Sequence, residues 1–351
     1  MVYLGFWREW PRLERLSPET LFTPFDQATQ LLQTALASSY LDAFLENAEN
    51  LADGGTVRVE DGVPDAETTE KLTKLYQSID LSQADRETKR RLLQLGMLKV
   101  TQKDAIQATH QMTPDSIGML MASLIERVTK IDHPYRILDP VVGTANLLTT
   151  VMNHLQSVTD QPIEGYGVDN DESMLSVAAV STQLQDLPVQ LYHQDAIRDL
   201  DVPQVDLVVA DLPVGYYPLD DNTKRYRTRA KEGHSYIHHL LIEQAMNYLL
   251  PGGFGVFLVP KALFQSKETA GLVEWIQSVA YMQGLINLPE ELFANPTGAK
   301  SLLLLQRQGG TSHQAGKVLL GSFPSVKNRP EFIAFIREID NWVAQYLAPA
   351  K

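Results

Sequence analysis

Cysteine is absent from this sequence of 351 residues, and that absence removes several classes of site at once. Without a thiol, the chain has no disulfide, no thiolate zinc site and no cysteine nucleophile. No apolar run approaches the roughly 20 residues that a membrane-spanning helix needs. The apolar segment Met1–Trp10 is interrupted by Arg8 and Glu9, and no small-residue cleavage site follows it, so it is not typical of a signal peptide. We therefore expect a cytoplasmic protein that does not bind membranes.

Basic residues are also scarce, since 30 Lys and Arg stand against 43 Asp and Glu, for a formal net charge of −13. Proteins that bind DNA alone usually carry a basic face that neutralises phosphates. The overall charge argues against tight, autonomous DNA binding, although it is compatible with one local basic patch. A hydrophobic fraction of 44% is ordinary for a soluble globular protein. At roughly 150 residues per domain, the length predicts about two domains.

The first hundred residues have a helical pattern. Apolar residues recur at helical spacing from Phe25 to Leu51, and two further helices are predicted around Leu72–Leu75 and Leu92–Leu95. No internal repeat or low-complexity segment interrupts this part of the chain. We interpret residues 1–103 as a helical accessory domain and residues 104–351 as a second domain of a different class.

The pattern changes after residue 110, where short aliphatic and β-branched runs alternate with helical segments, as in a parallel α/β sheet. The predicted strands are Arg136–Leu138, Glu164–Val168, Val189–Tyr192, Val205–Ala210, Phe254–Val259, Gly284–Leu288, Ser301–Leu305 and Val318–Phe323. The loop between Gly284–Leu288 and Ser301–Leu305 is too short for a crossover helix, so we expect these two strands to pair antiparallel. The sequence thus predicts an α/β fold whose sheet is parallel with one antiparallel strand.

Acidic side chains follow the first four of these strands, namely Asp139, Asp169, Asp195 and Asp211. In an open α/β sheet, the carboxyl ends of the strands line the ligand crevice. A single aspartate in such a position is most often the cap of the next helix. Four along one edge instead predict a binding site at that edge.

The loop after the first strand contains Gly143, which permits a tight turn and the close approach of a ligand. This loop opens a helix whose free N–H groups and dipole attract a carboxylate or phosphate, although a plain tight turn is the alternative. Asp169 is placed to bond a ribose diol, and Asp195 to accept from an adenine amino group. Together these positions predict a site for a nucleoside with a charged tail.

The fourth strand leads into the turn Asp211-Leu212-Pro213, which is followed by Tyr216 and Tyr217. Such a turn presents a carboxylate and backbone carbonyls to N–H donors, while an aromatic ring can stack on a planar group. The pattern favours a site for a planar group that carries an amine. The alternative is a proline-containing surface turn with half-buried tyrosines.

Taken in chain order, these strand ends and turns resemble the N6-adenine type of class I S-adenosylmethionine-dependent methyltransferases. Within that type, they are most similar to the YtxK-type branch and to the methylase subunits of type I restriction systems. The resemblance covers roughly residues 104 to 310 and rests on His110–Pro114, Asp139–Leu148, Asp169, Asp195 and Asp211–Val214. The likeness to the YtxK-type branch rests on Asp211–Pro218, Gly233–Tyr236 and Leu288–Glu290, and Ser235 and Tyr236 could lie at the edge of the cleft. It implies a Rossmann-like class I methyltransferase sheet, S-adenosylmethionine as cofactor, and residues 104–351 as the catalytic domain.

The same resemblance implies the roles of individual residues. The implied cofactor-binding residues are Met112, Thr113, Asp139, Pro140, Gly143, Thr144, Ala145, Asn146, Leu147, Asp169, Asn170, Asp195, Ala196 and Asp211. The implied catalytic residues are Asp211, Leu212, Pro213 and Tyr216. Asp211 and the Leu212 carbonyl would accept the two hydrogens of the substrate amino group, and a tyrosine ring would stack on the base. No metal-ligand spacing stands out, so no metal site is expected.

Three positions depart from the family pattern: Leu212 replaces a proline, Val214 replaces the aromatic residue and Ala145 replaces a glycine of the first loop. The cofactor half of the site therefore matches the family better than the substrate half. Three functions remain open. They are an N6-adenine methyltransferase acting on DNA or RNA, a methyltransferase for a protein amide or small molecule, and a non-catalytic regulatory subunit that binds S-adenosylmethionine.

One basic stretch lies close to the predicted substrate turn, and it consists of Lys224, Arg225, Arg227, Arg229 and Lys231 with Tyr226 among them. Basic residues interleaved with an aromatic suit a nucleic-acid backbone, and a solvated loop is the alternative. The segment after residue 310 is too short for a sizeable target-recognition domain. Nucleic acid is a candidate partner. The helical first hundred residues could partly serve in target recognition, or a separate specificity subunit could read the sequence.

Overall fold

The computed structural model describes residues 17–104, 112–266, 268–293, 298–325 and 327–347. His110 and Gln111, from the segment that carries the family resemblance, and the apolar segment Met1–Trp10 lie outside the described residues. The chain divides into two compact units, of which the first contains the N-terminal helices together with Gln183–Asp186. Within the described ranges, no helix is both long enough and apolar enough to cross a bilayer.

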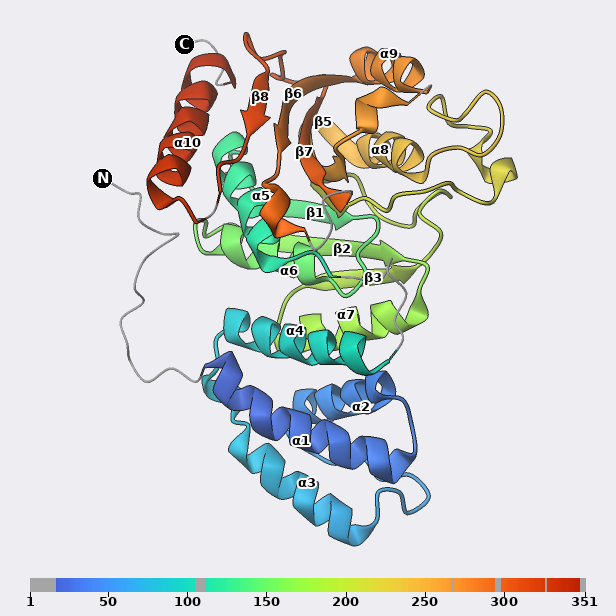
Figure 1. The fold of residues 1–351 in the computed structure, drawn as a ribbon, viewed down its shortest axis with the longest axis vertical. Coiled ribbons are helices and arrows are strands. Elements are labelled where there is room, and N and C mark those ends of the chain that lie inside the picture. Colours follow the sequence, from blue (N-terminus) through green and yellow to red (C-terminus); the bar gives the residue numbers. More distant parts are fainter. Residues whose placement is uncertain (1–16, 105–111, 267, 294–297, 326, 348–351) are drawn as a thin grey trace. The chain divides into compact units, whose positions relative to one another are not determined.

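The first unit is helical and consists of α1 (Pro18–Leu36), α2 (Tyr40–Ala52), α3 (Ala66–Ser78) and α4 (Arg86–Lys103) (Figure 1). A serine or aspartate side chain caps the start of each helix by accepting a backbone N–H from its first turn. Apolar side chains from these helices form the core, where Phe25 and Phe44 meet edge to face with ring centroids 5.8 Å apart. A helical N-terminal region is therefore confirmed.

The prediction of one continuous helical stretch from Phe25 to Leu51 is wrong. The chain breaks between α1 and α2, where Ala37 adopts the left-handed conformation with φ 48°. Ser39 then accepts the Asp42 N–H and starts the next helix. The apolar spacing conceals this break because buried residues continue at similar intervals on both sides of it.

The second unit contains one sheet with the strand order β3-β2-β1-β4-β5-β7-β6-β8 (Figure 1). Its strands are β1 (Tyr135–Asp139), β2 (Ile163–Asp169), β3 (Val189–His193), β4 (Val205–Asp211), β5 (Leu249–Pro260), β6 (Ala280–Asn287), β7 (Lys300–Arg307) and β8 (Leu319–Ser322). Among the strands that the structure describes, β7 alone runs antiparallel to its neighbours β5 and β6. The predicted antiparallel pairing of the sixth and seventh strands is confirmed.

Helices cover both faces of this sheet. They are α5 (Asp115–Val128), α6 (Asn146–Gln156), α7 (Glu172–Leu184), α8 (Ile237–Tyr248), α9 (Thr269–Val279) and α10 (Arg329–Trp342), which continues into a π-helical turn at Val343–Leu347. One core joins α5, α6 and α10 to one face, and a second joins α8 and α9 to the other. Successive residues of a strand enter opposite cores, as Leu302 and Leu303 of β7 do. Both faces are therefore apolar, and polar ligand contacts are concentrated at the strand ends.

Candidate functional site

Three predicted acids stand at the last residues of parallel strands. Asp139 ends β1, Asp169 ends β2 and Asp211 ends β4, while Asp195 lies two residues beyond the end of β3. The parallel register places Ile137 beside Leu207 and Asp139 beside Gly167, so these strands finish at the same edge. The sheet thus brings the acids together, as their order in the sequence predicts.

Asp139 is the most deeply buried of these acids, with 1% of its surface exposed. The Val141 N–H donates to its Oδ1 atom at 3.1 Å. Burial raises the pKa of the Asp139 carboxyl well above its usual range, and the nearby charges of Asp169 and Asp211 add to the increase. The raised pKa favours the protonated form of the Asp139 carboxyl, which can donate a hydrogen bond to a ligand at this edge.

Asp169 ties the end of β2 to the loop after β1. Its Oδ2 accepts the Gly143 N–H at 2.8 Å, and its Oδ1 accepts the Asp171 N–H at 3.0 Å. Gly143 has φ 51°, and a Cβ placed on it would face open space. A ligand can approach the backbone there because no side chain intervenes. Ala145 follows in the left-handed conformation with φ 61° and leads directly into α6.

A chain of hydrogen bonds links the segment before α5 to the turn after β4. The Asn146 side chain donates to the Thr113 carbonyl at 2.9 Å, and the Thr113 hydroxyl donates to Oδ2 of Asp211 at 2.9 Å. Met112 is half-buried, while Thr144 and Leu147 are buried. The structure therefore brings this predicted segment and the start of α6 to the same place as Asp211.

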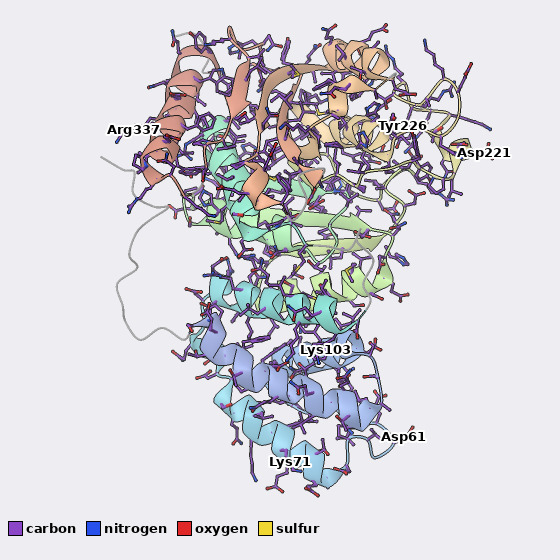
Figure 2. The ribbon with its side chains drawn as sticks, viewed as in Figure 1. Asp61, Lys71, Lys103, Asp221, Tyr226 and Arg337 are labelled. Atoms are coloured by element: carbon purple, nitrogen blue, oxygen red, sulfur yellow. The ribbon has the colours of Figure 1, made fainter. Side chains whose placement is uncertain are left out.

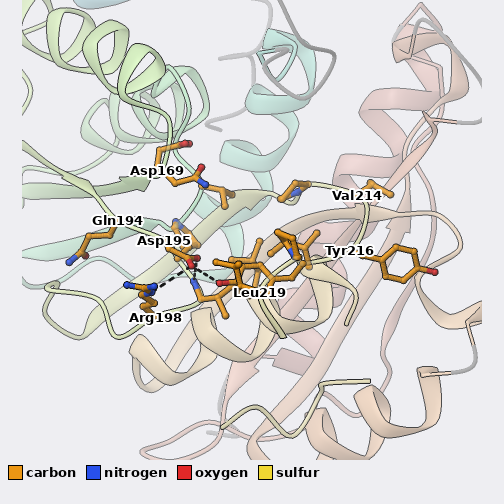
Figure 3. A pocket seen from close by; sticks show the side chains of 17 residues that line it. Asp169, Gln194, Asp195, Arg198, Val214, Tyr216 and Leu219 are labelled. Atoms are coloured by element: carbon orange, nitrogen blue, oxygen red, sulfur yellow. Dashed lines mark hydrogen bonds and ion pairs between the residues drawn. The ribbon is translucent and has the colours of Figure 1, made fainter. Parts of the chain in front are cut away.

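A cavity of about 490 Å³ opens beside these loops (Figure 3). The predicted site residues that line it are Pro140, Asp169, Asn170, Asp195, Ala196, Pro213 and Tyr216. Its volume suits a small organic ligand. Asp139, Gly143, Asp211 and Leu212 are not among its lining residues. The lining also includes Gln194 and Arg198, which follow β3 and which the sequence did not single out.

Asp195 is held by its own loop and by Tyr217. The Ile197 N–H donates to its Oδ1 at 3.0 Å, and the Tyr217 hydroxyl donates to its Oδ2 at 2.5 Å. Asn222 donates to the Tyr217 oxygen at 2.8 Å. Burial raises the pKa of Tyr217 to about 12, and the bond to Asp195 contributes in the same direction. Tyr217 therefore remains a proton donor at neutral pH and fixes the orientation of the Asp195 carboxylate.

The turn after β4 meets a lysine that sequence reasoning missed. The Lys300 ammonium forms an ion pair with Oδ1 of Asp211 and lies 3.4 Å from the Leu212 carbonyl oxygen. The strand register explains the contact, since Asp211 lies beside Leu258 of β5 and Lys300 lies opposite Pro260 of the same strand. Antiparallel pairing of β7 was the available signal, because it puts the start of that strand at the ligand edge.

Two tyrosine rings stand beside this turn. Tyr216 stacks on Tyr236 with ring centroids 4.8 Å apart and an angle of 22° between the planes, and their hydroxyl oxygens lie 3.3 Å apart. Tyr216 is 60% exposed, whereas Tyr217 is buried. Tyr216 thus offers a ring to the cleft and Tyr217 does not. Tyr236, immediately before α8, belongs to the segment Gly233–Tyr236, which the sequence placed at the edge of the cleft.

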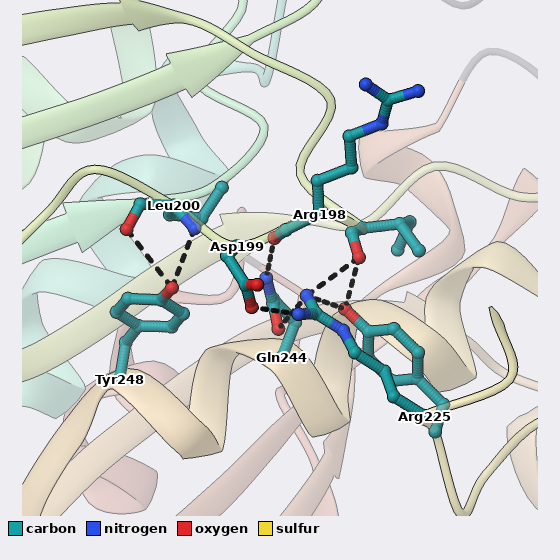
Figure 4. A network of polar contacts seen from close by, with 8 residues as sticks. Arg198, Asp199, Leu200, Arg225, Gln244 and Tyr248 are labelled. Atoms are coloured by element: carbon teal, nitrogen blue, oxygen red, sulfur yellow. Dashed lines mark hydrogen bonds and ion pairs between the residues drawn. The ribbon is translucent and has the colours of Figure 1, made fainter. Parts of the chain in front are cut away.

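The basic stretch is anchored to the sheet domain. Arg225 pairs with Asp199 and donates to the Ile197 carbonyl at 2.9 Å, within the network drawn in Figure 4. The buried carboxylate of Glu243 accepts the Arg227 and Thr228 backbone N–H groups at 3.0 and 2.8 Å. These contacts fix the backbone of the stretch.

The side chains of this stretch alternate between exposed and buried positions. Figure 2 shows Tyr226 beside α8 and Asp221 at the outer end of the same loop. Tyr226 and Thr228 are buried. The side chains of all five basic residues, Lys224, Arg225, Arg227, Arg229 and Lys231, are exposed. The loop therefore presents positive charge from a fixed backbone.

Two sequence profiles match the chain. The profile described as the YtxK N-terminal helical domain matches residues 19–100, and the profile described as N-6 DNA Methylase matches residues 95–327. A protein of Bacillus subtilis strain 168, described as uncharacterized protein YtxK, is 33% identical over 317 residues, which cover 90% of this chain and 94% of that protein.

Solved structures share the fold. A Listeria monocytogenes protein, provisionally assigned to the class I S-adenosylmethionine-dependent methyltransferases, is 40% identical with a TM-score of 0.84, covering 93% of this chain and 98% of that chain. A type I restriction-modification methyltransferase subunit from Streptococcus thermophilus is 11% identical with a TM-score of 0.61, covering 94% and 80% of the two chains. The second comparison concerns the fold alone.

A mostly parallel sheet with β7 antiparallel and helices on both faces places the protein in the class I S-adenosylmethionine-dependent methyltransferases. Within that class, the chain belongs to the N-6 DNA methylase family, and it carries a YtxK-type helical domain before the methylase domain. S-adenosylmethionine is the cofactor of this class of enzyme, and methyl transfer is its reaction.

Proposed function

We propose that the protein transfers the methyl group of S-adenosylmethionine to the exocyclic amino group of adenine in DNA or RNA. The observation that carries this proposal is the Asp211-Leu212-Pro213 turn at the end of β4, because its Asp211 carboxylate and Leu212 carbonyl accept N–H donors. Pro213 and the exposed Tyr216 both line the neighbouring cavity, so the turn borders that cavity.

The residues around the cavity fit the cofactor. Asp169 and Asp195 line a space of about 490 Å³, which is in the range of small-molecule sites. A carboxylate has four lone-pair positions. Asp169 and Asp195 can therefore each accept a ribose hydroxyl or an adenine amino group in addition to their present partners. Open space at Gly143 leaves room for a charged tail beside the N-terminus of α6. We assign cofactor binding to these residues together with Pro140, Asn170 and Ala196.

When bound, S-adenosylmethionine supplies an electrophilic methyl group on a sulfonium sulfur, which leaves as a neutral thioether. The adenine nitrogen forms the new N–C bond with its lone pair and then loses one proton to solvent. Asp211 and the Leu212 carbonyl hold the two N–H groups and stabilise the positive charge that develops on nitrogen. Stacking on the Tyr216 ring stabilises a base that has flipped out of its duplex by about 1–3 kcal/mol.

A nucleic-acid acceptor is supported by the basic stretch beside this turn. Its backbone is anchored through Glu243, while the side chains of Arg227, Arg229 and Lys231 are exposed. The logarithm of the binding constant falls linearly with the logarithm of the salt concentration, and each phosphate contact adds about 0.7–0.9 to the magnitude of this slope. Replacing these three cations with glutamine should reduce the slope for oligonucleotide binding by about 2 to 3 if each contacts one phosphate. We also propose that a separate subunit supplies sequence recognition, as the fold relationship to type I methylase subunits supports.

Val214 favours a second candidate, a subunit that binds S-adenosylmethionine without turnover. Its aliphatic side chain is 61% exposed where the family pattern has an aromatic ring. A regulatory subunit of this kind would bind the cofactor through the Asp169 and Asp195 side of the site. It would leave the Asp211 turn without a methyl acceptor, so it predicts cofactor binding and no methyl transfer to any substrate.

The deciding experiment incubates the purified chain with tritium-labelled S-adenosylmethionine and unmethylated DNA or RNA, followed by nucleoside analysis. We expect label in N6-methyladenine from the wild type and a loss of at least about 100-fold for Asp211→Ala, the range for removing one transition-state acceptor. Asp160→Ala, an exposed aspartate far along the sequence from the turn, is the matched control. Full activity of Asp211→Ala would remove the assigned role, and no transfer by the wild type would leave the second candidate.

A further inference from the structure

Lys300 occupies the acceptor atoms that the proposed function reserves for the substrate amino group. Its ammonium contacts both Oδ1 of Asp211 and the Leu212 carbonyl oxygen. The remaining oxygen of Asp211 accepts from the Thr113 hydroxyl at 2.9 Å. An incoming amino group must therefore share these atoms with the ammonium or displace it.

The groups around this contact make the ion pair hard to replace. The Lys300 and Asp211 side chains are only 21% and 24% exposed, so the pair is partly desolvated. His238 is buried nearby, and burial, His239 and the Lys300 charge lower its pKa to about 4. A neutral His238 supplies no positive charge that could replace the ammonium beside Asp211. Displacement of the Lys300 ammonium from the Leu212 carbonyl therefore loses a charge-assisted hydrogen bond.

The chemistry of the acceptor decides whether that bond is recovered. An isolated amine brings donors alone and offers the ammonium nothing in return. Adenine places ring nitrogens, which accept hydrogen bonds, on either side of its amino group, and the N7 edge presents this acceptor–donor pair directly. Such a group can donate to Asp211 and the Leu212 carbonyl while its ring nitrogen accepts from Lys300. The Tyr216 and Tyr236 stack beside the turn suits the planarity of such a group.

We infer that Lys300 is a specificity-determining residue of the methyl-acceptor site, a role that rests on the proposed function. It donates a hydrogen bond to the ring nitrogen beside the reacting amino group, so the site selects planar amino groups that have an adjacent hydrogen-bond acceptor. This role narrows the expected methyl acceptors from amines in general to nucleobases in which a ring nitrogen lies beside the amino group.

The test compares Lys300→Met with wild type on three DNA substrates of one sequence, which contain adenine, 7-deazaadenine or 1-deazaadenine at the methylated position. Methionine keeps most of the side-chain length and removes the donor. Lys261→Met is the matched control, because Lys261 forms an exposed ion pair with Glu290 at 3.3 Å near the same end of β5. Thermal unfolding and calorimetric binding of S-adenosylmethionine establish that each variant folds and binds cofactor.

We expect Lys300→Met to lower kcat/KM on adenine DNA by about 10- to 100-fold, the loss of one charged hydrogen bond. On the deaza substrate that lacks the partner nitrogen, the same variant should change kcat/KM by no more than about twofold. The wild type should itself discriminate against that substrate by a similar factor, which tests the inference even if the variant fails to fold.

Other outcomes overturn the inference in separable ways. An equal loss on all three substrates means that Lys300 only orients Asp211, and a gain of activity means that the ammonium obstructs the site. In both cases methylation of adenine by the wild type leaves the proposed function standing. A wild type that methylates no DNA or RNA overturns the proposed function and this inference together.

Discussion

Replacing Asp169 with alanine tests the cofactor half of the site most directly. The change removes the acceptor for the Gly143 N–H at 2.8 Å and for the Asp171 N–H at 3.0 Å, and it removes a carboxylate from the cavity wall. A hydrogen bond to a charged group contributes about 1.5–3 kcal/mol. Because the Gly143 bond fixes the loop to which we assign cofactor binding, at least one such contribution should be lost from binding. The dissociation constant for S-adenosylmethionine should therefore rise by about 10- to 150-fold.

Isothermal titration calorimetry with S-adenosylmethionine and with S-adenosylhomocysteine measures this effect. Asp169→Asn retains one side-chain carbonyl as acceptor, so its affinity should lie between those of wild type and Asp169→Ala. Asp160→Ala changes the net charge equally at an exposed position and should bind like wild type. If Asp169→Ala binds within about twofold of wild type while remaining folded, then Asp169 does not hold the cofactor and the site must lie elsewhere.

Two further predictions concern stability. Asp139 has a raised pKa in the folded protein, so folded stability should fall as pH rises from about 4, the unfolded value, towards that raised pKa. Asp139→Asn should abolish this fall in stability. In calorimetry the variant should melt at a higher temperature than wild type at pH 7, by about 2–4 °C for each kcal/mol of stability gained, and should show no such gain at pH 4. A lower melting temperature of the variant at pH 7 would contradict the burial argument. Gly96→Ala should destabilise α4 by about 1–3 kcal/mol in urea titrations, because a Cβ there collides with Phe44. Gly271→Ala in α9 meets open space and should instead stabilise by up to about 1 kcal/mol; equal effects would exclude the steric explanation.

The sheet was predictable because its signal is local. Apolar runs bounded by turns located all eight strands, and loop length alone gave the antiparallel pairing of β6 and β7. The helices α5 and α9 were not among the predicted elements. Every residue of α5 is buried or half-buried, so α5 lacks a clean polar face, whereas α9 buries only Leu272, Trp275 and Ile276. A helix buried on several sides loses the amphipathic period that sequence reasoning depends on.

The candidate site divides in the same way. Asp139, Asp169 and Asp211 were predictable because the end of a parallel strand is a fixed position at the ligand edge. Lys300 was missed because it reaches the site through a tertiary contact. Nothing in the residues flanking Lys300 marks it, and its role follows from the register of three strands.

The contact between Asp211 and Lys300 also bears on how the molecule is made. The two residues are 89 positions apart, and the strand that bears the lysine must insert between β5 and β6 before they meet. During synthesis on a ribosome, the acidic ends of β1, β2 and β4 all leave the exit tunnel before Lys300 does. Repulsion among those carboxylates is then relieved last, when β7 completes the sheet. A nascent chain that stops before residue 300 should keep an open, uncompensated acidic edge.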